Sequence, residues 1–227
     1  MNNITIHDEI RLSRLGLGNG TRWDIYIGAP ETDAMRIIVK VAQKLQTEYT
    51  CIHFHIISGD AVDIQGGIEK GLLDFGILMG PIDKSRYEFL EFPIRDIMGV
   101  LMRKDSKLAL QETINPKDLW KKSLIVPRQL ALSYDLAHWL STEPSKLKIT
   151  GTYTLLYNAS LMVEEGMGYA LGLDKIINTT GNSSLCFRPL SPAITVGINI
   201  LWKRDHKFTK EAEVFINSLS QHISTGV

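Results

Sequence analysis

Few side chains in this 227-residue sequence have the types and spacing that catalysis or metal binding requires. His53 and His55 alternate along an expected strand and would share one face, but no third ligand lies near them in sequence. Glu164 and Glu165 are adjacent, so they point to different sides of a helix and cannot form an acid–base pair. Cys51 has no resolving cysteine nearby. The sequence therefore predicts no enzyme, no metal site and no cofactor.

Charge and hydropathy exclude further classes of protein. The 25 basic residues balance the 25 acidic ones, so composition gives no basic surface for nucleic acid or anionic lipid. The sequence "GLGNG" precedes a strand pattern instead of following one, which argues against a nucleotide-binding loop. No apolar run reaches the ~18 residues of a membrane-spanning helix, and the first residues lack the apolar centre of a secretory signal. With only two distant cysteines, these features favour a reduced cytoplasmic protein with no membrane partner.

The first half of the chain alternates between strand and helix patterns. Strands are expected at "WDIYIGA", "CIHFHIISG" and "DFGILMG". The helix between the first two would begin at a cap, Thr32 or Asp33, and its buried face would comprise Met35, Ile38, Val39, Ala42, Leu45 and Tyr49. A weaker helix at 61–70 is interrupted by two glycines, Gly66 and Gly67. This β-α-β-α-β order predicts a doubly wound α/β lobe.

The second half repeats the alternation after a long strand at 94–105. The expected elements are a short helix at 115–122, a strand at 123–128, a helix around 132–140, a strand at 146–153, a helix beginning at Asn158 and a strand at 168–174. A second long strand at 194–204 and a helix at 209–223 close the chain. We therefore expect an α/β fold of two doubly wound lobes with discontinuous connectivity, at 22–95 plus 200–227 and at 96–199, after a linker at 1–21.

Ligands of open α/β sheets bind beyond the carboxyl ends of the strands, at helix starts. Two facing lobes would form a cleft from the loops 30–33, 58–61, 127–133 and 153–158. The helix beginning at Asn158 carries no reactive group, but its free backbone N–H groups could hold a ligand oxygen.

The order of these segments resembles the effector-binding domain of LysR-type transcriptional regulators. The resemblance rests on "IYIGAPETDAMRIIVKVAQKLQTEY", "ISGDAVDIQGGIEKGLLDFGIL", "SLIVPRQ", "YNASLMVEEGMGYAL", "FRPLSP" and "INILWKR", and it spans residues 22–224. It implies a fold of the type II periplasmic-binding-protein kind. It also implies that a small-molecule inducer binds between the lobes and modulates transcription.

The same resemblance implies partners for a longer parent protein. The family carries a helix-turn-helix domain and a linker helix before this domain, and "HDEIRLSRLG" matches only the end of that linker. DNA binding is therefore expected only through an N-terminal domain absent from this chain. A homodimer or higher homo-oligomer is expected, paired through the helices at 33–47 and 133–141. The alternative is the solute-binding protein of a transporter, which shares the fold but has no place for a linker helix.

Loop position and resemblance together predict the effector-binding residues Thr32, Asp33, Gly59, Arg128 and Asn158. Each has a structural alternative: Thr32 and Asn158 suit helix caps, Gly59 suits a turn, and Arg128 suits an exposed surface. The fork of Arg128 would match a carboxylate. Glu31 and Asp33 would repel an anion, so an amphoteric or amine-bearing effector fits the charges better.

Overall fold

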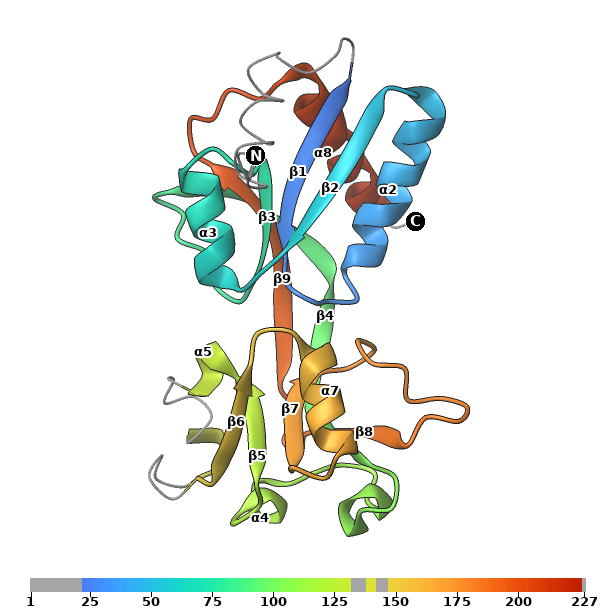
Figure 1. Cartoon of the computed structure of the whole chain (residues 1–227). Coiled ribbons are helices and arrows are strands. Elements are labelled where there is room, and N and C mark those ends of the chain that lie inside the picture. The colour runs from blue at the N-terminus through green and yellow to red at the C-terminus, as the bar shows by residue number, and fades with distance from the viewer. Residues whose placement is uncertain (1–21, 132–137, 142–146, 226–227) are drawn as a thin grey trace, which may run out of the picture. The chain divides into compact units, whose positions relative to one another are not determined.

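The computed structural model describes residues 22–131, 138–141 and 147–225, and these divide into two compact units (Figure 1). Of the described residues, unit 1 contains 22–30, 34–94 and 197–225, and unit 2 contains 31–33 and 95–196 with its gaps. The expected linker at 1–21 and most of the expected helix at 132–140 lie outside the described residues.

Unit 1 is built on a sheet in which three parallel strands are followed by one antiparallel strand. The order is β2-β1-β3-β9, with bounds Ile52–Ser58, Trp23–Ala29, Phe75–Met79 and Thr195–Lys203. Its helices are α2 (Met35–Glu48), α3 (Ala61–Glu69) and α8 (Lys210–Thr225). The strand β4 (Tyr87–Arg103) begins in unit 1 and continues in unit 2, and β9 makes the return passage.

Both faces of the unit 1 sheet are covered, because alternate residues of the strands bury against different helices. The helices α2 and α8 cover one face and α3 covers the other (Figure 1). Ile25 and Ile27 pack with α2 and α8, whereas Tyr26 between them packs with α3. The α8 contribution is Ala212, Phe215, Ile216 and Leu219, whose spacing places them on one face of that helix. Burial on both faces is what a doubly wound sheet requires.

Two helices of unit 1 differ from the prediction. The buried residues of α2 are Ile38, Val41 and Leu45, and Val39, which was expected in the core, is 57% exposed. The spacing of Ile38, Val41 and Leu45 defines the buried face of this helix. Val39 and the lysine after it lie outside that face. The glycines at 66 and 67 do not interrupt α3, which is continuous and begins at an Asp60 capping box.

Unit 2 contains a mixed sheet with strand order β6-β5-β7-β4 and with β8 on the other side of β4. The bounds are Ile149–Tyr153, Leu124–Pro127, Tyr169–Leu173 and Leu185–Pro189 for β6, β5, β7 and β8. The helices are η1 (Lys107–Leu110), α4 (Pro116–Leu119), α5 (Arg128–Ala131) and α7 (Leu156–Glu164). Asn115 begins α4 as expected, and the N–H of that residue donates to Asp118 at 2.9 Å.

The strand β8 was missed by the sequence patterns, which gave no element between the strands expected at 168–174 and 194–204. Leu185 and Cys186 of β8 are buried, and β8 pairs antiparallel with the last residues of β4. The approach is close at Gly99, where a Cβ atom would lie 2.4 Å from the carbonyl oxygen of Arg188. The sequence of β8, LCFRP, has neither a continuous apolar run nor an alternating pattern, because Arg188 and Pro189 follow its three apolar residues.

The helix α7 covers one face of this sheet (Figure 1). Its residues Leu156, Ala159 and Val163 are buried with Leu101 and Ile125. The helix ends before Gly166, which adopts a φ of 80°. Two sheets with helices on both faces confirm the doubly wound α/β class. None of the described helices has the length and apolarity to cross a membrane.

Candidate functional site

The three residues 31–33 lie in sequence between β1 and α2, but they belong to unit 2. Each of them contacts a residue far along the chain. Their partners are the first turn of α7, the middle of β4 and the turn after β7, namely Leu156, Asp96 and Lys175. These contacts bring two predicted effector-binding residues, Thr32 and Asp33, beside the start of α7.

The Thr32 side chain is committed to a buried hydrogen bond. Its hydroxyl donates to a carboxylate oxygen of Asp96 at 2.5 Å, and the two residues are 6% and 7% exposed. The prediction that Thr32 or Asp33 caps α2 was wrong, because Ala34 occupies the cap position and makes no side-chain cap bond. The helix begins at Met35, so neither Thr32 nor Asp33 occupies the position directly before it.

The surroundings of Asp96 favour its protonated form. Burial is the largest cause and raises the pKa of this carboxyl above its ordinary value, and the negative charges of Asp33 and Asp174 act in the same direction. The Thr32 hydrogen bond and the positive charge of Lys175 oppose that shift. The site thus holds a buried carboxyl group whose pKa is shifted toward the neutral form.

The start of α7 is bound by a carboxylate of the protein itself. An oxygen of Glu31 accepts a hydrogen bond from the backbone N–H of Leu156, the first residue of the helix. The prediction that the helix begins at Asn158 was wrong: Leu155 is the cap residue, with extended backbone and no side-chain cap bond. Burial of Leu156 decides the start, and Asn158 is an exposed residue within the first turn.

Tyr153 fixes the chain just before α7. Its hydroxyl donates to the backbone carbonyl of Leu171 at 2.6 Å, and a Cβ atom at Gly172 would lie 3.1 Å from the same hydroxyl. Burial and the negative charge of Glu31 raise the pKa of Tyr153, so the phenol stays a neutral donor. This hydrogen bond holds the residues directly before the first turn of α7 in place.

The remaining predicted site residues are placed differently. Asp33 lies 3.7 Å from the ammonium group of Lys175, an ion pair in which the lysine side chain is exposed and the aspartate is half-buried. Arg128 is exposed at the first residue of α5 in unit 2. Gly59 belongs to unit 1 and donates its N–H to Ala29 at 3.2 Å, directly before the Asp60 cap. The structure thus groups Thr32, Asp33 and the first turn of α7, and it places Gly59 in the other unit.

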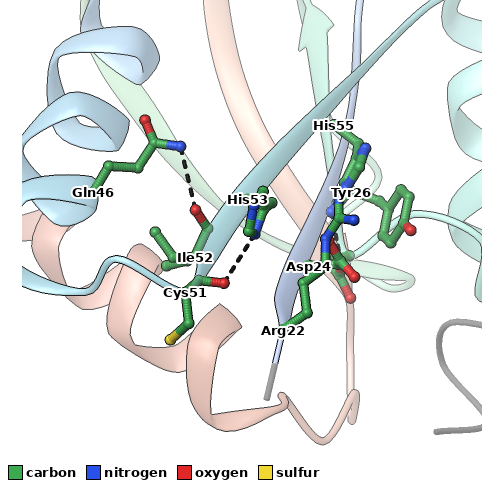
Figure 2. Close-up of polar contacts among 9 residues, drawn as sticks. Arg22, Asp24, Tyr26, Gln46, Cys51, Ile52, His53 and His55 are labelled. Atoms are coloured by element: carbon green, nitrogen blue, oxygen red, sulfur yellow. Dashed lines mark hydrogen bonds and ion pairs between the residues drawn. The ribbon is translucent and has the colours of Figure 1, made fainter. Parts of the chain in front are cut away.

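The histidines of β2 make contacts of their own (Figure 2). His55 Nε2 lies 2.9 Å from a carboxylate oxygen of Asp24, which also accepts from Arg22 at 2.9 Å, and its ring stacks on Tyr26. His53 Nδ1 lies 2.9 Å from the carbonyl oxygen of Cys51. Across residues 22–131, 138–141 and 147–225, no three His, Cys, Asp or Glu side chains are grouped as metal ligands would be.

Sequence reasoning missed Asp96 and Lys175. The available signal for Asp96 was a single acid within the apolar strand "IRDIMGVLM", a position where burial demands a partner. Lys175 follows β7 with a φ of 64° and gave no signal, because a lysine after a strand is ordinary.

Comparison with known proteins yields a family match and a relative. The model of the family described as LysR substrate binding domain matches residues 18–224. The uncharacterized HTH-type transcriptional regulator YvbU of Bacillus subtilis (strain 168) is 26% identical over 119 residues. That match covers 52% of this chain and 39% of the relative, so the chain spans well under two thirds of that protein.

Solved structures show the same fold at low identity. The effector-binding domain of QuiR in complex with shikimate has a TM-score of 0.76 at 15% identity, covering 90% of this chain and 98% of that one. The regulatory domain of CcmR from Synechocystis PCC6803 in complex with 2-PG has a TM-score of 0.75 at 14% identity, covering 89% and 98%. These domains have the type II periplasmic-binding-protein-like fold, so the expected architecture is confirmed.

Proposed function

Because this chain belongs to the family of LysR substrate-binding domains, we propose that it senses a small molecule and passes that signal to transcription. The family match over residues 18–224 carries this proposal. Regulators of this family bind small-molecule effectors and act as oligomers on DNA, and their effector-binding domains are not enzymes. The match favours this function over the solute-binding protein of a transporter.

The second part of the proposal concerns the whole regulator. We propose that it binds DNA through a helix-turn-helix domain that this chain does not contain, and the match to an HTH-type regulator supports this. Such a protein works in the cytoplasm, where the DNA is. A bound effector increases the population of the domain conformation for which the effector has the higher affinity. DNA binding responds to that change in population.

The third part concerns the site. We propose that the effector contacts unit 2 at the segment 31–33 and the first turn of α7, with Arg128 and Asn158 as further contacts. The buried pair Thr32–Asp96 supports this, since it positions the segment firmly. Gly59 remains a proposed contact from unit 1. The units themselves are proposed to be the two lobes, at 22–95 plus 200–227 and at 96–199.

A screen for thermal stabilisation of this chain by metabolites tests the sensing function, because a ligand that binds only the folded state raises the melting temperature. Each hit is then tested with the full-length regulator for a change in affinity for its own promoter. The expected result is a compound that does both. A compound that stabilises this chain tightly and leaves DNA binding unaltered would contradict the proposal.

The expected partner is a second copy of the chain. We propose a homodimer with two-fold symmetry in which α2 takes part, supported by family membership and by the exposed Val39 on α2. Light scattering at a protein concentration of about tens of micromolar is expected to give twice the monomer mass. A Val39→Glu variant should lower that mass, and an unchanged dimer would exclude this helix from the interface.

A further inference from the structure

The helix α7 takes its N-terminal cap from a distant part of the chain. The cap residue Leu155 has no polar side chain, and its position makes no side-chain cap bond. Instead, the carboxylate of Glu31, 125 residues away in sequence, accepts the N–H of Leu156. In unit 1, by contrast, α3 is capped locally by Asp60, whose carboxylate accepts from Val62 and Asp63.

A carboxylate is well suited to bind at the N-terminus of a helix such as α7. The free N–H groups and the dipole of a helix make its N-terminus a binding position for anions. Glu31 fills this position in α7, and the nine residues of the helix give it two full turns behind the contact. The charge of Glu31 also reaches the Tyr153 phenol that anchors the helix start, which agrees with a carboxylate held close to it.

We propose that Glu31 is a built-in ligand of α7, whose carboxylate keeps small carboxylate compounds from binding at the start of this helix. The inference rests on the proposed function and deepens it, because it makes Glu31 a determinant of which effectors the sensor accepts. Effectors that are neutral or carry an amine leave Glu31 in place. Effectors that present a carboxylate to α7 must first displace it.

Further acids strengthen this selectivity. Asp33, Asp96 and Asp174 face the same segment, and Lys175 is the base that pairs with Asp33 there. An external carboxylate at the start of α7 would therefore also meet the negative charges of Asp33 and Asp174.

Chemical rescue by acetate tests the proposal without any knowledge of the effector. In Glu31→Ala the N–H of Leu156 loses its partner, and acetate can take the vacated position. Sodium acetate is compared with sodium chloride at equal ionic strength, and the melting temperature of Glu31→Ala is expected to be about 2–4 °C higher in acetate. Wild type should show no difference between the two salts.

Two variants serve as controls. Glu165→Ala removes an exposed acid at the other end of α7 and should respond to acetate as wild type does. Glu31→Gln keeps an amide oxygen that can accept the Leu156 N–H, so acetate should not stabilise it further. Equal responses of Glu31→Ala and wild type to acetate, whether present or absent in both, would overturn the proposal.

Should Glu31→Ala fail to fold, NMR of wild type decides the question. The amide resonance of Leu156 should move when acid protonates Glu31, and it should not move in Glu31→Gln. A Leu156 amide that responds identically in both proteins would also overturn the proposal. Since no effector enters these measurements, their failure would leave the sensing function intact, and an unsuccessful metabolite screen would leave Glu31 as the ligand of α7.

Discussion

The hydroxyl of Thr32 and the carboxylate of Asp96 are 2.5 Å apart, although 64 residues separate them in sequence. Both residues are buried, so neither group can exchange its partner for water without cost. This bond holds the segment between β1 and α2 against the part of β4 that belongs to unit 2.

Removing the Thr32 hydroxyl should destabilise the protein. Thr32→Val keeps the shape of the side chain but withdraws a hydrogen bond from the buried Asp96 carboxylate, and the expected loss is about 1–3 kcal/mol in the free energy of unfolding. Thr32→Ser keeps the hydroxyl and should lose clearly less. Urea denaturation measures both variants, and a loss for Thr32→Ser as large as that for Thr32→Val would show that the bond contributes no more than packing of the methyl group.

The raised pKa of Asp96 predicts a pH dependence of stability. The folded protein holds this proton more tightly than the unfolded chain, so the resulting stability is complete below the ordinary value of 3.8 and is lost as the pH rises through the raised pKa. Asp96→Asn cannot ionise. Wild type should therefore lose stability relative to Asp96→Asn as the pH rises from below 3.8 toward neutral. Urea denaturation of both proteins across that range checks the sign, which a constant or opposite difference would contradict.

Loss of a polar residue near the N-terminus should change the free energy of unfolding in opposite directions for the helices α3 and α7. Asp60→Ala removes the capping box of α3 and is expected to destabilise the protein by about 0.5–2 kcal/mol. Asn158 lies within α7 and is exposed, so Asn158→Ala should raise stability by about 0.5 kcal/mol through helix propensity. Thermal unfolding of the pair distinguishes a cap from a helical surface residue, and a loss at Asn158 comparable with that at Asp60 would restore it as a cap.

Two glycines should respond oppositely to alanine. A Cβ atom at Gly66 would meet no atom within 4 Å, so Gly66→Ala should stabilise α3 by about 0.5–1 kcal/mol. At Gly99 the Cβ atom would approach the Arg188 carbonyl oxygen to 2.4 Å, so Gly99→Ala should lose about 1–3 kcal/mol or more as β8 moves away. Chemical denaturation measures the free energy of unfolding of both variants. An unchanged value for Gly99→Ala would mean that β8 can move away from β4 at little cost.

Helices and strands whose apolar residues recur at a regular spacing could be predicted from the sequence. The strands β1 to β3, the closing helix α8 with its buried face and the cap of α4 all follow from local patterns. Such patterns are local because helix and strand periods are set by neighbouring residues. The strand β8, LCFRP, shows no such pattern, and its pairing with β4 is decided at long range.

The contacts of the site were less accessible to sequence reasoning. The predicted loops suggested Thr32 and the start of α7 as parts of the site. The partners of the segment 31–33, however, lie 64 to 142 residues away in the chain, so no local pattern indicates them. The acceptor at the start of α7 comes from Glu31, a contact over 125 residues that no local pattern can show.

The return of β9 and α8 to unit 1 has a consequence for biosynthesis. The sheet face formed by Ile25, Ile27 and Phe75 is closed by Phe215 and Leu219. The ribosome adds these two residues only after every residue of unit 2 has been joined. Of the two units, the one whose synthesis begins first is therefore completed last, and its apolar face stays open on the nascent chain until α8 has been made, a state in which chaperones bind exposed apolar surface.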